Sequence, residues 1–256
     1  MIHGDSMTKG NPWLPFGSHP EADITLLCLP HAGAGAITYR SWGQGLPPEI
    51  AVCPVQPPGR ERRRGEEPFT SVEPLTKELA KVITDSVQAP YAVFGHSTGA
   101  LCAFETLREL RRTNGPLPVH LFVSGRCAPQ TPLTRHDLAD MGLAELADLL
   151  RQLGGTPEEV LAEPDLLALL QPLLAADFSV NEGYAHTAEP PLDIPVTAFA
   201  GIDDQGADVA LTEPWAIHTA QEFVLHALPG GHFAIFDSVA EVHSHIAAAL
   251  APYCRN

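Results

Sequence analysis

Ser97 stands between two glycines in the pentapeptide Gly-His-Ser-Thr-Gly, residues 95–99. A run of strand-forming residues precedes this pentapeptide, and a helix-like stretch of small residues follows it. A serine in a strand-to-helix turn flanked by glycines is typical of the nucleophile elbow, in which a strained backbone exposes the serine hydroxyl. The sequence therefore predicts that Ser97 is a nucleophile rather than an idle residue of a glycine-rich turn.

A nucleophilic serine needs a general base and an acid that orients this base. In chains with the elbow, the acid and then the histidine follow the serine. His232 stands in a glycine turn directly after the strand-like run of "EFVLHALPGG" and before an apolar helix start, so we predict it to be the base. His96 lies inside the elbow, where we expect it to support the turn by packing or hydrogen bonding.

Two adjacent acids compete for the orienting role at the tip of the strand-like run "TAFAG". The usual loop places a glycine, two residues and then the acid. Counting from Gly201 selects Asp204. Asp203 is the alternative, because turn boundaries cannot be read from a sequence to a single residue.

The tetrahedral intermediate of acyl transfer needs preorganised N–H donors, each contributing about 3 kcal/mol. The residue after the nucleophile, Thr98, supplies one backbone N–H in this kind of turn. The other donor comes from a loop after an early strand. The small residues of "LPHAGAGA" suit close approach to a ligand, and we predict the N–H of Ala32 as this second donor.

Short apolar runs alternate with helical patterns along the chain. The runs in "DITLLCLP", "EIAVCP", "YAVFGH", "PVHLFVS", "IPVTAFAG" and "EFVLHAL" read as strands, and helices are expected from Val72 onwards and over about 239–250. This alternation predicts an α/β protein with a mostly parallel sheet flanked by helices. Ligands of such sheets bind at the carboxyl ends of the strands, where the polar loops described above all fall.

Residues 133–189 interrupt this alternation, because they contain no good strand and read as leucine-rich helices. We predict a helical lid whose apolar side lines a pocket for an acyl chain, with extra core helices as the alternative. The expected organisation is a single domain over residues 21–256 with this insertion. A partly flexible N-terminal extension is expected over residues 1–20.

The acidic composition excludes several classes of partner. With 15 basic and 31 acidic residues the net charge is -16, which disfavours nucleic acids and anionic membranes. No apolar run approaches a membrane span, and the first residues lack an apolar signal segment, so a cytoplasmic protein is expected. The 5 cysteines form no C-x-x-C pair, which predicts neither a metal site nor a disulfide framework. We expect no cofactor.

Several segments together resemble the type II thioesterases of polyketide and nonribosomal peptide biosynthesis: "LPHAGAGAITYRSW", "PPGRERR", "FGHSTGA", "SGRCAPQ", "LLAADF" and "PGGHF". The resemblance implies an α/β-hydrolase fold with a helical lid. It also implies hydrolysis of acyl groups from the phosphopantetheine arm of acyl or peptidyl carrier domains, which removes stalled or wrongly loaded chains.

The resemblance also assigns the site residues. It implies that Ser97, Asp204 and His232 form the catalytic triad, and that Ala32 and Thr98 form the oxyanion hole. One position departs from the family, in which the residue after the serine is usually Met or Leu. Thr98 keeps the backbone donor but makes the adjoining pocket more polar, so the preferred acyl group is left open.

The expected partners are carrier proteins, and a monomer is the expected state of the enzyme. Because carrier domains are generally acidic like this chain, docking must depend on local contacts. The basic cluster with Arg60, Arg62 and Arg63 is the candidate docking site, and a solvated turn paired with its own glutamates is the alternative.

Two other functions use the same residues differently. An acyltransferase would have an identical triad and a different acceptor in place of water. A non-catalytic binding protein on the same fold would be expected to lose a member of the triad, and all three are present here.

Overall fold

The computed structural model describes residues 11–17, 21–133 and 135–255. Its centre is a 6-stranded sheet with the order β2-β1-β3-β4-β5-β6, in which every neighbouring pair is parallel. This confirms the predicted fold class. The strands are β1 (Ile24–Leu29), β2 (Ile50–Pro54), β3 (Tyr91–His96), β4 (Leu121–Ser124), β5 (Val196–Gly201) and β6 (Phe223–Leu228).

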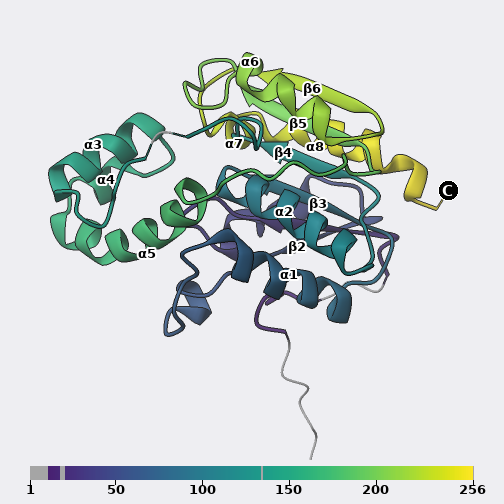
Figure 1. The fold of residues 1–256 in the computed structure, drawn as a ribbon, viewed down its shortest axis with the longest axis horizontal. Coiled ribbons are helices and arrows are strands. Elements are labelled where there is room, and N and C mark those ends of the chain that lie inside the picture. Colours follow the sequence, from purple (N-terminus) through teal and green to yellow (C-terminus); the bar gives the residue numbers. More distant parts are fainter. Residues whose placement is uncertain (1–10, 18–20, 134, 256) are drawn as a thin grey trace, which may run out of the picture.

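Helices cover both faces of the sheet (Figure 1). Successive side chains of a strand point to opposite faces, so Leu27 packs in the core under α1 and α2, whereas Leu26 packs in the core under α8. The strands are apolar on both sides for this reason, as expected for a covered parallel sheet. The helices that pack around the sheet are α1 (Val72–Ser86), α2 (Thr98–Arg112), α6 (Val209–Thr212), α7 (Ala234–Asp237) and α8 (Val239–Leu250).

Three helices separate β4 from β5, within the segment predicted as a lid. They are α3 (Leu143–Leu153), α4 (Glu158–Leu161) and α5 (Pro164–Glu182). Figure 1 shows them together at one side of the sheet. They enclose an apolar cluster of their own that includes Leu146, Leu150 and Leu174, while Val180 near the end of α5 belongs to the main core. Helix α5 therefore joins the lid cluster to the body of the domain.

The chain that returns from α5 to the sheet is tied to α2 by buried charges. Arg108 on α2 pairs with Glu105 at 2.5 Å and with Glu189 at 2.8 Å. The hydroxyl of Tyr184 donates a hydrogen bond of 2.7 Å to the same Glu105. These bonds anchor the stem of the lid to the helix that follows Ser97.

Part of the expected N-terminal extension packs with the domain. Trp13 is 3% exposed and belongs to the main core, and its carbonyl accepts a hydrogen bond of 2.8 Å from the backbone N–H of Gln56. Residues 11–17 therefore contribute to the domain. The rest of the predicted extension, residues 1–10 and 18–20, lies outside the described residues. Among the described residues, no helix combines the length and apolarity required to cross a membrane.

Acid should destabilise the fold through its buried imidazoles, and His120 offers a direct test. This side chain is 7% exposed, bonds the Thr197 hydroxyl at 2.8 Å, and burial lowers its pKa to about 4. A histidine whose pKa is lowered by folding stays neutral while the unfolded chain takes up a proton below pH 6.5, so stability falls with pH until the folded pKa is reached.

Lowering the pH from 7 to 5 should therefore reduce the free energy of unfolding of the wild type by about 2 kcal/mol more than that of His120→Gln. Urea denaturation at the two pH values measures this difference. The same acid-induced loss in both proteins would show that His120 does not titrate on unfolding.

Candidate active site

The backbone at Ser97 is strained. Its φ of 56° and ψ of -120° lie in a region that residues with a side chain rarely adopt, and this conformation costs about 1–3 kcal/mol. The residue stands between the end of β3 and the start of α2, and its N–H donates a hydrogen bond of 2.8 Å to the carbonyl of Ser124 at the end of β4. Sheet and helix together hold the turn in this conformation.

The two glycines of the pentapeptide are required by close backbone approach. A Cβ on Gly95 would collide with the carbonyl oxygen of Gly99, and a Cβ on Gly99 would collide with the carbonyl oxygen of Leu29. The first glycine lets α2 fold back onto β3, and the second lets α2 approach the end of β1. The elbow thus brings Ser97 next to the loop that follows β1.

His232 and Asp204 form a hydrogen-bonded pair with 2.8 Å between Nδ1 and Oδ2. The second oxygen of Asp204 accepts the backbone N–H groups of Gly206 at 2.9 Å and Ala207 at 3.2 Å. Burial opposes ionisation of this carboxyl, but the bonds from His232 and the two N–H groups lower its pKa from the usual value. Asp204 is therefore a fixed carboxylate that holds one nitrogen of the imidazole.

Asp203, the alternative acid, is exposed, and its backbone N–H bonds the carbonyl of Gly230. The structure thus brings Asp204 rather than Asp203 to His232. The ring of His232 lies 5.1 Å from the ring of His96, the residue before Ser97. Among the described residues the Ser97 hydroxyl forms no hydrogen bond with His232. In free enzymes the distance between nucleophile and base is often long, and it shortens when substrate binds.

The loop after β1 and the first residue of α2 line one small cavity. Ala32 and Thr98 both border it, and among the described residues neither backbone N–H donates to a backbone or side-chain acceptor. The cavity measures about 30 Å³, which is room for about one water molecule. Two unused N–H donors at a cavity beside a strained serine are what an oxyanion hole requires.

Two further histidines pack around this site. The ring of His31 lies 5.6 Å from that of His96 and 5.0 Å from the ring of Phe233. Burial lowers the pKa of His31 to about 4 and that of His96 well below its usual value, with the nearby His232 adding to both shifts. The Nδ1 of His96 lies 3.2 Å from the hydroxyl of Ser124, so this ring packs and bonds within the turn as predicted from the sequence.

The arginine cluster has a different environment from the one expected for a docking site. Arg60 is 7% exposed and pairs with Asp177 of α5 at 2.7 Å. Arg63 is 9% exposed, bonds Glu66 at 2.6 Å and lies over the ring of Trp13. Both are therefore internal structural groups, while Arg62 is exposed.

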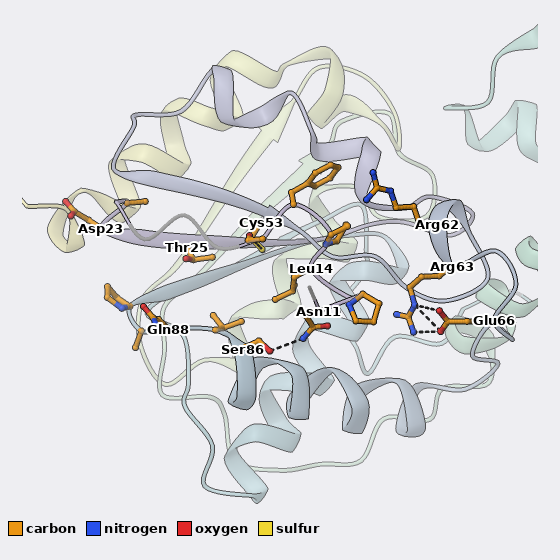
Figure 2. Close-up of a pocket in the computed structure, with 18 residues that line it drawn as sticks. Asn11, Leu14, Asp23, Thr25, Cys53, Arg62, Arg63, Glu66, Ser86 and Gln88 are labelled. Atoms are coloured by element: carbon orange, nitrogen blue, oxygen red, sulfur yellow. Dashed lines mark hydrogen bonds and ion pairs between the residues drawn. The ribbon is translucent and has the colours of Figure 1, made fainter. Parts of the chain in front are cut away.

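A larger cavity of the described residues lies elsewhere. It has a volume of about 770 Å³ and runs between Asp23, Gln88 and Arg62, as Figure 2 shows. In the same figure the side chain of Arg63 points to Glu66. This cavity is bordered neither by the predicted triad nor by Ala32 and Thr98, whereas the small cavity is bordered by Ala32 and by Thr98, the residue after Ser97. The size of the larger cavity therefore does not mark it as the place of the chemistry.

The family model for the thioesterase domain matches residues 24–250, which is nearly all of the described chain. The protein belongs to the thioesterase family. This finding confirms the resemblance seen in the sequence, and the enzyme is a thioester hydrolase.

The gramicidin S biosynthesis protein GrsT of Aneurinibacillus migulanus is 40% identical over 92% of this thioesterase and 93% of its own length. Among solved structures, the thioesterase RedJ from the prodiginine pathway of Streptomyces coelicolor is 36% identical, with a TM-score of 0.84 over 90% of this chain and 92% of RedJ. The type II thioesterase BorB from the borrelidin cluster is 33% identical, with a TM-score of 0.84 over 95% and 99%. These neighbours confirm the α/β-hydrolase fold.

Sequence reasoning missed two buried polar residues beside the thioesterase site. Asp177 of α5 accepts the N–H of Gly33, directly after Ala32, and the side chain of Gln56 accepts the N–H of Ala36 at 3.0 Å. The motif "LLAADF" contributed Asp177 to the family resemblance, but without a role. An acid in the middle of a leucine-rich helix was the available indication that this position is buried and paired.

Replacing Asp204 with Asn should lower kcat by about four orders of magnitude, because an amide cannot hold the histidine tautomer or stabilise its imidazolium form. Asp203→Asn is the matched control, since it removes an exposed carboxylate one residue away. Steady-state hydrolysis of a small acyl thioester measures both. A larger loss in Asp203→Asn would identify the other carboxylate as the orienting acid.

Proposed function

We propose that this thioesterase hydrolyses acyl groups from the phosphopantetheine arm of carrier domains and so clears aberrant or stalled chains. The observation that carries the proposal is the strained Ser97 turn beside the hydrogen-bonded Asp204–His232 pair in a chain of the thioesterase family. The type II thioesterase BorB and the pathway protein RedJ support the assignment to carrier-bound substrates.

In the proposed mechanism His232 takes the proton of Ser97 as its oxygen attacks the thioester carbonyl. Because Asp204 holds Nδ1, the other ring nitrogen is directed at the reaction. The developing oxyanion accepts hydrogen bonds from the N–H groups of Ala32 and Thr98. The intermediate then expels the phosphopantetheine thiolate, a stable leaving group. The proton held by His232 passes to this sulfur or to solvent, so the histidine is neutral again before water attacks.

Deacylation reverses the roles with water as the nucleophile. His232 removes a proton from the water, the new tetrahedral intermediate uses the same two N–H donors, and the proton returns to Ser97 as the acid leaves. The neutral rings of His31 and His96 favour these steps, because a second cation at this distance would oppose the imidazolium form of His232.

The lid must admit the acyl group in this proposal. With α5 in place the cavity of about 30 Å³ is far smaller than the 300–1,000 Å³ of ordinary ligand pockets. Its walls include Leu79, Cys102 and, from α5, Val180. A displacement of the part of α5 that precedes Val180, including Asp177, would open the cavity beside these apolar walls, which agrees with the predicted role of the leucine-rich insertion as a lid.

Hydrolysis should be visible directly on a carrier protein. Incubation of an acylated carrier with the enzyme should remove the mass of the acyl group and leave the free phosphopantetheine thiol, as measured by intact-mass spectrometry. Ser97→Ala should abolish this conversion, because no other described group replaces the nucleophile. Appearance of the acyl mass on an added amine, alcohol or second thiol would identify an acyltransferase instead.

A serine-directed phosphonate gives the matching covalent test. Labelling should occur on Ser97 in the wild type and be absent in Ser97→Ala. Modification of a cysteine, or a near-wild-type rate in Ser97→Ala, would refute the serine mechanism.

Only the exposed arginines of this loop, Arg62 and Arg64, are free to contact a carrier domain, because Arg60 and Arg63 are buried. Their reversal in Arg62→Glu/Arg64→Glu should raise KM for acyl-carrier several-fold, because an acidic carrier would meet added negative charge. Hydrolysis of a small acyl thioester should be unchanged. Lys77→Glu/Lys81→Glu on α1 is the control with the same change in net charge, and equal effects of both double variants on KM would exclude a specific docking role.

A further inference from the structure

The loop that carries Ala32 is held from outside by a side chain of the lid. The N–H of Gly33 donates a hydrogen bond of 2.7 Å to Oδ2 of Asp177, which lies on α5. The same helix packs directly on the loop, since a Cβ on Gly33 would lie 2.7 Å from Cδ2 of Leu174. Gly33 has a φ of +77°, a conformation that glycine adopts without strain.

Arg60 bonds both Asp177 and the same loop. Its Nη2 donates to Oδ1 of Asp177 at 2.7 Å, and its Nη1 donates to the carbonyl of Ala34 at 3.4 Å. Arg60 is held in turn by Gln56, whose amide nitrogen donates to the Arg60 carbonyl at 3.2 Å and whose oxygen accepts the N–H of Ala36. The buried ion pair thus bonds the loop at two places, through Asp177 at Gly33 and through Arg60 at Ala34.

The ion pair between Asp177 and Arg60 is buried, and it lies beside the oxyanion loop. Asp177 is 7% exposed and Arg60 is 7% exposed, and a pair so far from water gains little net stability over apolar packing. Burial raises the pKa of Asp177, against the opposing effects of Arg60 and the Gly33 N–H. Both residues also border the small cavity with Ala32 and Thr98.

We propose that Asp177 is a positioning residue that orients the oxyanion loop through Gly33, so that the oxyanion hole is complete only when α5 is seated. The peptide that contains the Gly33 N–H directly follows Ala32, so fixing this N–H fixes the neighbouring donor. When α5 moves away to admit or release a chain, the bond to Gly33 breaks and the donor loses its orientation. The lid and the chemistry are thereby coupled through one carboxylate.

This inference rests on the proposed serine mechanism, and the test has readouts that separate the two. Asp177→Asn keeps the shape of the side chain, but its single oxygen can accept from only one of the two donors. We expect kcat for a small acyl-N-acetylcysteamine thioester to fall about 10- to 100-fold with little change in KM, because the affected donor acts mainly in the transition state. The rate of phosphonate labelling at Ser97 should fall in parallel, because the phosphonyl oxygen occupies the same hole.

Gln171→Ala is the matched control on the same helix. Gln171 donates to the carbonyls of Leu138 and Met141 at 2.8 and 2.7 Å, so its loss removes bonds within the insertion and leaves the contacts of α5 with the oxyanion loop in place. A thermal unfolding midpoint is measured for each protein. Equal kcat in Asp177→Asn and Gln171→Ala, or a loss that tracks only the unfolding midpoint, would overturn the proposal.

Arg60→Lys keeps the inference testable if Asp177→Asn does not fold. It retains the charge next to Asp177 but loses the planar fork that reaches Ala34 at the same time, so a fall in kcat of about 3- to 10-fold is expected with KM unchanged. An unchanged kcat in Arg60→Lys would contradict the role of the Asp177–Arg60 pair in holding the loop. A wild type that is labelled at Ser97 but cleaves no thioester would refute the proposed function alone, since the labelling rates of the variants would still test the positioning role.

Discussion

The strained turn at Ser97 is the constraint on which the site depends. The packing of α2 against β3 and β1 offsets the backbone strain at Ser97. This packing requires glycine at 95 and 99, because a Cβ at either position would collide with backbone atoms. The same packing brings the end of β1 next to the start of α2. The two N–H groups that line the small cavity, from Ala32 and Thr98, therefore come together through the same interaction that exposes the serine.

Around this turn, polar groups are positioned by bonds to the backbone rather than by bonds to one another alone. Asp204 accepts two backbone N–H groups besides His232, and Asp177 accepts the Gly33 N–H besides Arg60. Backbone donors are fixed by the fold, so they hold each carboxylate in one orientation at little entropic cost. The two carboxylates thus hold the ring of His232 and the loop after β1 each in one orientation.

The insertion between β4 and β5 has a divided structure that suits a movable cover. Its own apolar cluster holds α3, α4 and the first part of α5 together, whereas the end of α5 and the stem that follows it join the main core and α2. A body with a separate core and a fixed stem can shift without unfolding. Contact with the oxyanion loop occurs where α5 passes from one core to the other, at Leu174 and Asp177.

The sequence determined the sheet, the elbow and the order in which Ser97, an acid after Gly201 and His232 follow one another, because these follow from local patterns of apolar runs, glycines and turn residues. Val239–Leu250 was even predicted with the observed ends of α8. Tertiary structure alone decided which of two adjacent acids meets His232, since a shift of one residue changes which side chain turns inward. It also decided that Arg60 and Arg63 are buried and that Asp177 bonds Gly33, because residues 144 positions apart meet only when α5 folds over the end of β1.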